Sequence, residues 1–294
     1  MIGEPQSTTG RRIVAFSNRP AALGLITDWV ARNGHRPLLV VTTPGPSTRR
    51  STTYRDVVAL SPPGLDVFVT TRVRRAIPLI AALAPDLIVS ASFPYRIPPE
   101  IVAIPRHGAI NVHPAPLPAY RGPNMARAIY DGAATFGVTV HRTAEDYDTG
   151  GILAQEVRPM PAQPSTESVF ALLKECAAAA LDAGAARAFA DEAGESQDEA
   201  LATYAAPFTD AERWLRWAEP AAVLNRQALA LTLMGLDARA TIEGGPYAVT
   251  ALRPVPDAPP DVAPGTVVRR ANGTFILRVG DGLVEIEASP AADG

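Results

Sequence analysis

Short apolar runs alternate with helix-length segments through the first part of this chain, and this alternation constrains the fold more than any other feature. Five runs are expected to form strands, at residues 12–16, 36–42, 66–69, 86–90 and 109–112. The intervening segments can hold crossover helices, which we expect at 21–32 and 74–83. Strands joined in this way build a mostly parallel sheet. Because runs such as Leu87 to Val89 are apolar without alternation, both faces of the sheet should be covered. The sequence therefore predicts a doubly wound α/β fold.

The same pattern continues as far as a polar segment near residue 195. Two further strands are expected, at residues 138–141 and 152–157. Ser165 or Thr166 can cap the next helix, which should run to about Ala190. Residues 191–200 are polar and acidic, and we expect them to form a linker. We therefore place a first, catalytic domain at 11–195.

The remainder of the chain has a different order of elements. Thr209 or Asp210 is expected to cap a helix that carries Trp214 and Trp217, and a second helix is expected at 221–233. Four short strands punctuated by Gly-Gly, Asn-Gly and Asp-Gly turns should follow, at residues 247–252, 265–269, 274–279 and 283–286. This order predicts a small β-barrel-like (OB-like) domain at 205–294.

The charge balance and the single cysteine argue against several classes of protein. The formal net charge is −3, which gives no reason to expect a nucleic-acid or membrane-surface protein. Cys176 lies in an alanine-rich run, so we interpret it as a small core residue, in keeping with a reducing cytoplasm. No run approaches the roughly 18 apolar residues of a membrane span, and residues 1–10 lack the apolar core of a signal peptide. We expect a cytoplasmic protein without membrane contact.

The first candidates for chemistry, Asn111 and His113, lie at the end of the fifth predicted strand. They are separated by one residue, so both side chains should project to the same side of an extended strand. In open α/β sheets, ligands bind at the carboxyl ends of the strands. Asp148 lies in a tight Tyr-Asp-Thr-Gly turn between two later strands. We expect Asn111 and Asp148 to meet at adjacent strand ends.

An amide, an imidazole and a carboxylate together suit the attack of an amine on a formamide-like carbon. Asn111 can donate an N–H to the developing oxyanion. His113 can do the same, or it can move a proton between the attacking and leaving nitrogens. Asp148 can accept a hydrogen bond from the imidazole and collect the proton of the amine. This chemistry requires no metal ion.

Each of these residues alone is weak evidence for a site. An Asn or Asp near a turn usually binds its own backbone, and a single histidine is more often structural than catalytic. We interpret His35, His107 and His141 as structural. The acidic turn at 144–148 would, by itself, be a solvated surface turn.

Four motifs occur in order, at residues 111–114 (NVHP), 117–123 (LPAYRGP), 137–141 (GVTVH) and 148–153 (DTGGIL). Their joint pattern resembles the folate-dependent formyltransferase family. The resemblance covers about 12–190 and continues more weakly to the chain end. The family's Asn-x-His and Asp-Thr-Gly elements match Asn111, His113 and Asp148, which implies their catalytic roles.

The resemblance also implies 10-formyltetrahydrofolate as the formyl donor. It assigns the donor to the loop after the fourth strand and to the turn before Asp148. The implied contacts are Ser92, Phe93, Arg96, Ile97, Asp146 and Tyr147. The family loop after the histidine usually reads HPSLLP, whereas this chain has Ala115 and Pro116 there.

The acceptor is the open question within the resemblance. Residues 205–294 contain 8 Arg and 11 Asp or Glu, a net charge of −3, and a tRNA enzyme should present a basic face. The short basic loop at 46–55 argues the other way, since the tRNA enzymes have a longer basic loop there. We favour a small amine, either a nucleotide-linked amino sugar or a specialised-metabolite amine, over methionyl-tRNA.

Two further alternatives stay open. Formyltetrahydrofolate deformylases use a similar Asn, His and Asp with water as the acceptor, but they carry an additional domain before the catalytic one. Only about ten residues precede the first predicted strand here, so we do not expect that domain. A non-catalytic binding module is the other alternative, and the loss of a triad member would support it. Oligomerisation through the apolar C-terminal unit is possible.

Overall fold

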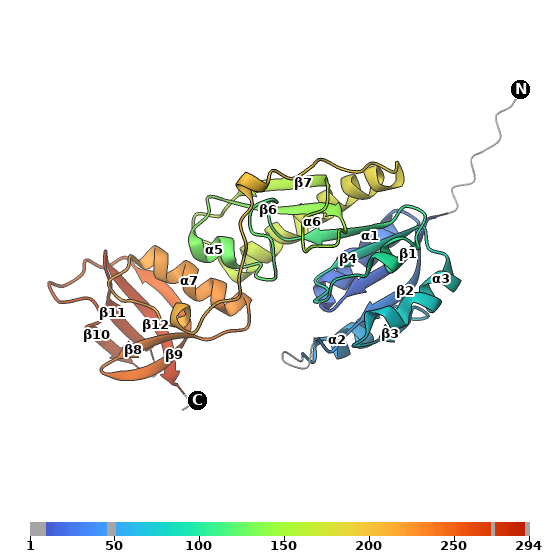
Figure 1. Cartoon of the computed structure of the whole chain (residues 1–294). Helices are drawn as coiled ribbons and strands as arrows, with labels where there is room; N and C mark the ends of the chain where they lie inside the picture. Colours follow the sequence, from blue (N-terminus) through green and yellow to red (C-terminus); the bar gives the residue numbers. More distant parts are fainter. Residues whose placement is uncertain (1–9, 46–50, 272–273, 292–294) are drawn as a thin grey trace, which may run out of the picture. The chain divides into compact units, whose positions relative to one another are not determined.

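The computed structural model describes residues 10–45, 51–271 and 274–291 (Figure 1). They form two compact units. The first contains the described residues up to 121 together with 137–157 and 173–203. The second contains 122–136, 158–172 and the described residues from 204 onward. No helix in these ranges has the length and apolar character needed to cross a membrane.

Seven strands form a mixed sheet in the order β3-β2-β1-β4-β5-β6-β7. They are β1 (Arg12–Ser17), β2 (Arg36–Thr42), β3 (Asp66–Val69), β4 (Leu87–Ala91), β5 (Ala109–His113), β6 (Thr135–Arg142) and β7 (Ile152–Pro159). The pairs among β1 to β5 are all parallel, whereas β6 runs antiparallel to β5. Every residue of β4 is buried, as expected for an apolar strand covered on both faces. The predicted mostly parallel α/β sheet is confirmed.

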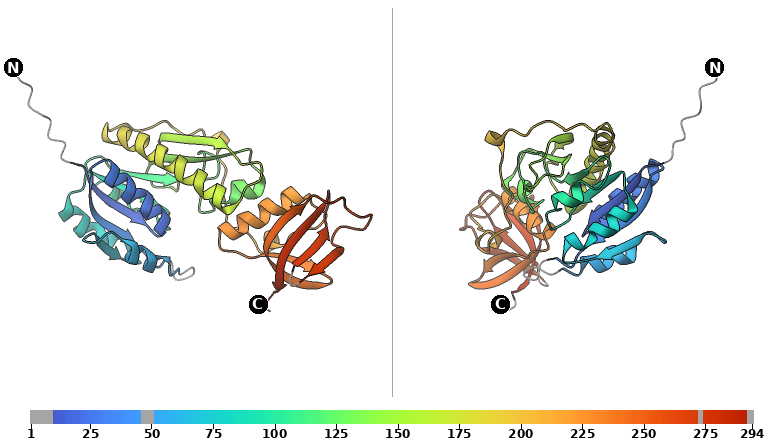
Figure 2. Two further views of the ribbon diagram at one scale, coloured as in Figure 1. Left: turned by 180° about the vertical axis from the view of Figure 1, so that it is seen from behind. Right: turned by 45° about the vertical axis from the view of Figure 1, so that its right-hand side comes forward.

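Helices cover both faces of this sheet. They are α1 (Pro20–Arg32), α2 (Thr53–Leu60), α3 (Ile77–Leu83), α4 (Pro99–Val102) and α6 (Thr166–Phe189), and a 3-10 turn, η2 (Val73–Ala76), precedes α3. Ile80 of α3 and Ile101 of α4 pack with Val14 of β1 in one core cluster. Seen from behind, α1 (blue) and α6 (yellow) cover the sheet (Figure 2). A Cβ on Gly184 of α6 would lie 2.5 Å from a methyl carbon of Val140, so the small residue permits this close packing.

The second unit contains a five-stranded antiparallel sheet in the order β10-β11-β12-β9-β8. Its strands are β8 (Ala238–Ile242), β9 (Gly245–Val255), β10 (Val267–Ala271), β11 (Thr274–Arg278) and β12 (Leu283–Pro290). Its helices are α5 (Arg127–Asp131) and α7 (Ala221–Leu233), with the short turn η4 (Ala211–Arg213). Leu224 and Leu231 of α7 share a buried core with Phe275 and Ile286 of the sheet. The predicted helix at 221–233 and the C-terminal β unit are confirmed.

The predicted helix carrying Trp214 and Trp217 is wrong. The backbone N–H of Leu215 donates to the carbonyl of Arg239 at 2.7 Å, and Trp217 Nε1 donates to the carbonyl of Thr241 at 2.8 Å. This segment therefore runs along β8, a strand that the sequence analysis missed. Pairing with a distant strand outweighs a weak local helical preference.

Two other expectations meet the structure only in part. Residues 191–200 were expected to be a linker, yet Glu195 pairs with Ile152 through two backbone hydrogen bonds of 2.8 and 2.9 Å. The basic loop at 46–55 includes residues 46–50, which lie outside the described ranges, as does the Asn-Gly turn at 272–273. The domain boundaries of 11–195 and 205–294 stay a proposal.

Candidate active site

Strand β5 presents Asn111 and His113, and the turn between β6 and β7 presents Asp148. Asn111 Nδ2 lies 3.5 Å from Asp148 Oδ1, and His113 Nδ1 lies 3.5 Å from Asp148 Oδ2. The structure thus brings the three predicted catalytic residues together around one carboxylate. The expectation of adjacent strand ends is only partly right. Because β6 is antiparallel to β5, its last residue, Arg142, pairs with Ile110 near the start of β5.

The hydrogen bonds of His113 determine which ring nitrogen is basic. His113 Nε2 lies 2.9 Å from the carbonyl oxygen of Tyr120, and a carbonyl only accepts, so Nε2 carries the proton. The lone pair of Nδ1 then faces Asp148. Burial lowers the pKa of His113, an effect that outweighs the opposing pull of Asp148 and of the Tyr120 carbonyl; His141 lowers it further. The neutral ring therefore offers Nδ1 as a proton acceptor.

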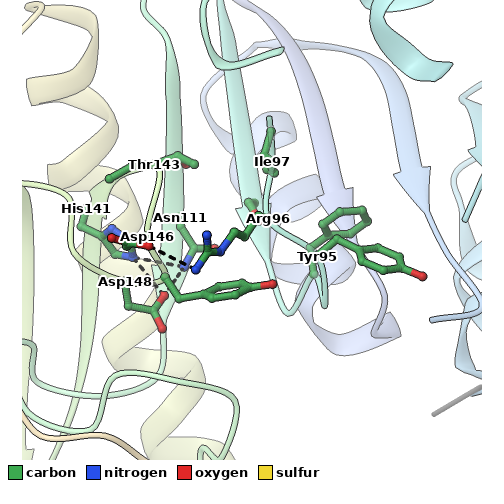
Figure 3. A pocket seen from close by; sticks show the side chains of 12 residues that line it. Tyr95, Arg96, Ile97, Asn111, His141, Thr143, Asp146 and Asp148 are labelled. Carbon is green, nitrogen blue, oxygen red and sulfur yellow. Dashed lines mark hydrogen bonds and ion pairs between the residues drawn. The ribbon is translucent and has the colours of Figure 1, made fainter. Parts of the chain in front are cut away.

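His141 is a site residue that sequence reasoning missed, because it was interpreted as structural. Its Nδ1 donates to the carbonyl of Arg142 at 2.8 Å, which leaves Nε2 to accept from Asn111 Nδ2 at 3.1 Å. His141 Nε2 also lies 3.6 Å from Asp148 Oδ1. Figure 3 shows Asn111, His141 and Asp148 directed toward one another. Only the register that pairs Asn111 with His141 across β5 and β6 reveals this contact.

A hollow of about 60 Å³ lies beside these side chains (Figure 3). Asn111, His141 and Asp148 form its polar end, and Phe93 and Ile97 contribute apolar wall. The other predicted folate residues in its lining are Arg96, Asp146 and Tyr147. His113 is absent from the lining and reaches the hollow through Asp148.

Ser92 stands apart from the other predicted folate contacts. It has a φ of +53° at the start of the loop that follows β4, and its carbonyl accepts the backbone N–H of Asn18 at 3.2 Å. In this position it links the turn after β1 to the loop that carries Phe93, Arg96 and Ile97. Its contact is with the protein backbone.

Two features of the hollow bear on ligand binding. Thr143 Oγ1 is buried in its wall and has no hydrogen-bond partner among the described residues, so a polar ligand atom could satisfy it. Arg96 forms an ion pair with Asp146 at 3.1 Å, and its guanidinium lies 4.9 Å from the ring centre of Tyr147. The Arg96 and Asp146 side chains are 54% and 71% exposed. An exposed pair of this kind is worth at most about 1 kcal/mol, so it can open readily.

A wider, open groove of about 660 Å³ shares Tyr95, Arg96 and Tyr147 with the hollow. Its remaining wall includes Arg72, Arg74 and Arg75, which are all exposed. Glu100 pairs with Arg74 at 3.2 Å. The groove therefore carries positive charge next to a partly apolar hollow, which suits a flat ligand with an anionic tail.

Comparisons with known proteins show which family the chain belongs to. Residues 12–182 match the family model described as formyl transferase, and residues 207–293 match the model of the formyl transferase C-terminal domain. The methionyl-tRNA formyltransferase of Roseiflexus sp. (strain RS-1) is 33% identical over 222 residues, 74% of this chain and 67% of the relative. The methionyl-tRNA formyltransferase of Thiobacillus denitrificans is 29% identical over 285 residues, 95% of this chain and 92% of the relative.

Solved structures share the fold at low identity. HypX from Aquifex aeolicus, in complex with tetrahydrofolic acid, has a TM-score of 0.70 at 20% identity, over 94% of this chain and 43% of that protein. An N-formyltransferase from Helicobacter canadensis, in complex with folinic acid and dTDP-3-aminofucose, has a TM-score of 0.65 at 14% identity. That alignment covers 95% of this chain and 100% of the other.

Proposed function

Because this chain belongs to the folate-dependent formyltransferase family, we propose that it transfers the formyl group of 10-formyltetrahydrofolate to the amine of a small acceptor. The observation that carries the proposal is the meeting of Asn111, His113 and Asp148 beside a hollow that is lined by the loop after β4 and the turn between β6 and β7. A hydrogen-bond donor, a neutral base and a carboxylate are the groups that acyl transfer between two nitrogens needs.

Asn111 supplies the hydrogen bond to the oxyanion in this proposal. Its Nδ2 lies 3.1 Å from His141 Nε2 and 3.5 Å from Asp148 Oδ1. Because 3.5 Å is at the long limit of a hydrogen bond, the N–H that His141 does not accept is the one that donates to the formyl oxygen as the amine nitrogen bonds to the formyl carbon.

His113 and Asp148 move the proton. Nδ1 of neutral His113 and Oδ2 of Asp148 are 3.5 Å apart and both accept, so the pair can take one proton from the attacking nitrogen. The same proton goes to the leaving nitrogen of the donor as its bond to the formyl carbon breaks. No net proton is gained by the enzyme.

In this proposal the formyl donor occupies both the hollow, with its heterocycle, and the groove, with its glutamate tail. The hollow supplies the apolar walls of Phe93 and Ile97 and the unpartnered Thr143 hydroxyl for a flat heterocycle. At about 60 Å³ it is smaller than the roughly 300–1,000 Å³ typical of ligand sites, so Arg96 must swing away from Asp146 for the heterocycle to enter. The arginines of the groove then lie where the glutamate tail of the donor leaves the hollow.

Addition of 5-formyltetrahydrofolate, a stable analogue of the donor, is expected to stabilise the protein. At 100 times its Kd a ligand adds about 2.7 kcal/mol to the free energy of unfolding, which corresponds to a rise in Tm of about 5–10 °C. Arg72→Ala with Arg75→Ala should weaken binding severalfold, because two ionic contacts are lost. Calorimetry and thermal unfolding measure both effects. If no reduced folate stabilises the protein even at high concentration, the proposed donor is wrong.

Charge in the second unit supports a small acceptor over tRNA. Residues 205–294 have a net charge of −3, and several of their arginines are already neutralised. Arg239 pairs with Asp210 at 3.0 Å, and Arg270 pairs with Glu243 at 3.3 Å. Nucleic-acid phosphates need free cationic side chains. The curated relatives named as methionyl-tRNA formyltransferases keep tRNA as the second candidate.

The dependence of formylation on salt concentration distinguishes a small-amine acceptor from a tRNA acceptor. For a small amine, kcat/KM should change little between 50 and 200 mM salt. A tRNA acceptor with 6–10 phosphate contacts would lose about 10³–10⁵ in affinity over that range. The measurement is formylation of methionyl-tRNA and of a panel of primary amines, including a nucleotide-linked amino sugar, at each salt concentration. Efficient, strongly salt-dependent formylation of methionyl-tRNA contradicts the small-acceptor proposal, and formate release without any amine favours a hydrolase.

A further inference from the structure

The segment at residues 197–203, which we name the clamp segment, reaches the backbone on both sides of the candidate site. Gln197 Nε2 donates to the carbonyl oxygens of Asp148 and Gly150, at 2.8 Å each. Thr203 Oγ1 accepts the backbone N–H of Tyr120 at 2.8 Å. The carbonyl of Tyr120 is in turn the acceptor for His113 Nε2. One segment thus touches the backbone that carries the carboxylate and the backbone that holds the imidazole.

Both contacted residues have an unusual backbone conformation. The φ angle is +59° at Asp148 and +60° at Tyr120. A left-handed conformation of a residue other than glycine costs about 1–3 kcal/mol and persists where surrounding contacts over-determine it. The hydrogen bonds from Gln197 and Thr203 are such contacts. Without these hydrogen bonds, each residue loses part of the restraint that holds this conformation, and its attached group can shift.

Arg121 joins the two arms of the clamp segment, which are Gln197 with its bonds to the Asp148 turn and Thr203 with its bond to Tyr120. Its side chain is largely buried, and its Nε and Nη2 donate to Gln197 Oε1 at 3.1 and 2.8 Å. The same guanidinium binds both carboxylate oxygens of Glu199 at 2.8 and 2.9 Å, and its backbone N–H donates to the carbonyl of Thr203 at 2.9 Å. The amide of Gln197 is therefore held at its oxygen by a cation and at its nitrogen by two carbonyls, which determines its orientation.

We propose that Gln197 and Thr203 are positioning residues for catalysis, through which the clamp segment keeps Asp148 Oδ2 aligned with His113 Nδ1. This inference rests on the proposed function, since it concerns the same proton-moving pair. Neither residue lines the hollow, so both act through the backbone of the residues that do the chemistry.

Gln197→Met tests the first arm. Methionine has a similar length and no charge. It removes both hydrogen bonds to the turn and the two that Gln197 accepts from Arg121, while Arg121 keeps Glu199. We expect kcat to fall about tenfold to a hundredfold, the scale of a misplacement of about 1 Å, with KM for the donor nearly unchanged. Glu195→Gln is the control, because it changes a charge two residues away whose side chain contacts Arg187. It should retain wild-type turnover.

Thr203→Val and Thr203→Ser test the second arm as a matched pair. Valine keeps the shape but removes the oxygen that accepts the Tyr120 N–H, so kcat should fall in the same range. Serine restores the oxygen and should recover turnover. Equal turnover in the two variants overturns the role of this hydroxyl, because a packing role alone depends on shape, which valine preserves better than serine.

A measurement without any acceptor separates failure of the clamp from failure of the proposed function. The titration of His113 can be followed by NMR of histidine-labelled protein, with the resonance assigned from His113→Ala. In Gln197→Met the Asp148 carboxylate should drift from Nδ1, so His113 should titrate at lower pH than in the wild type. An unchanged titration overturns the inference even if turnover falls. If the wild type transfers no formyl group but the titration of His113 is shifted in Gln197→Met, the proposed function is wrong and the positioning of Asp148 by Gln197 is supported.

Discussion

Replacement of His113 by alanine is expected to lower the turnover of formyl transfer by about 10²–10⁴, the usual contribution of a positioned acid–base group. The reason is geometric. Nδ1 of His113 faces Asp148 Oδ2 at 3.5 Å, and the Tyr120 carbonyl holds the opposite nitrogen at 2.9 Å. Alanine leaves the attacking amine without this proton acceptor. Single-turnover kinetics with saturating donor and acceptor measure the loss directly.

His107→Gln is the matched control for this variant. His107 is also a buried histidine with a carboxylate partner, Asp191, at 2.7 Å, but it has no contact with the candidate site among the described interactions. This variant should lower stability and leave the turnover of the folded protein close to the wild type. If His113→Ala also keeps near-wild-type turnover, His113 is a structural residue and the proton route is wrong.

The pH profile gives a second readout for the same residue. The pKa of His113 is lowered from 6.5 by burial, so the ring stays neutral as the pH falls through 6.5. The acid limb of kcat should therefore lie below pH 6.5. Asp148 raises the pKa of His113, and its replacement by asparagine should move this limb to still lower pH. The unfolded chain protonates His113 at higher pH than the folded chain does, so its contribution to stability falls as the pH drops below 6.5.

Asn111→Ala and Asp148→Asn are the second pair of changes with large expected effects. Loss of an oxyanion donor typically costs about 10²–10³ in kcat. Asp148→Asn keeps the shape of the side chain but removes the charge beside His113, and we expect a loss of about 10²–10⁴ in kcat. Affinity for the donor should fall far less than kcat in both variants, since both changes act mainly on the reacting groups.

The three proposed catalytic residues, Asn111, His113 and Asp148, should behave as one unit. The triple variant is expected to lose little more than the worst single variant, because each single change already disables the same step. Purely multiplicative losses in single-turnover rates would contradict a shared network. Measurements of Asn111→Ala should include donor binding by calorimetry, which must be retained if the residue acts on the oxyanion.

Local sequence was sufficient for most of the first unit. The unbroken apolar run at Leu87 to Val89 predicted a strand buried on both faces, and β4 is fully buried. The prolines that follow His113 predicted a loop without helix, and the chain does form turns there. Both features depend on residues that are close together in the chain. Hydrophobic periodicity and the backbone restrictions of proline act within a few positions.

Predictions from local sequence were wrong where hydrogen bonds to a distant part of the chain stabilise the segment. Trp217 lies in a stretch with a plausible helix start, yet its indole donates to Thr241 on β8. Gln197 lies in a polar stretch that was expected to be a linker, yet its amide holds the turn at Asp148. In both cases the hydrogen bonds with residues more than twenty positions away outweigh the local preference.

The sequence by itself determined the α/β class, the C-terminal β unit, and the identity of Asn111, His113 and Asp148 as the residues to test. Spacing along one strand and the order of short motifs carry that information. Only the tertiary structure decided that β6 runs antiparallel, that His141 Nε2 accepts from Asn111, and that Gln197 reaches Asp148. These contacts join residues 30 and 49 positions apart. Sheet register and the path of the chain after α6 bring them within hydrogen-bond distance, and no local pattern encodes that register.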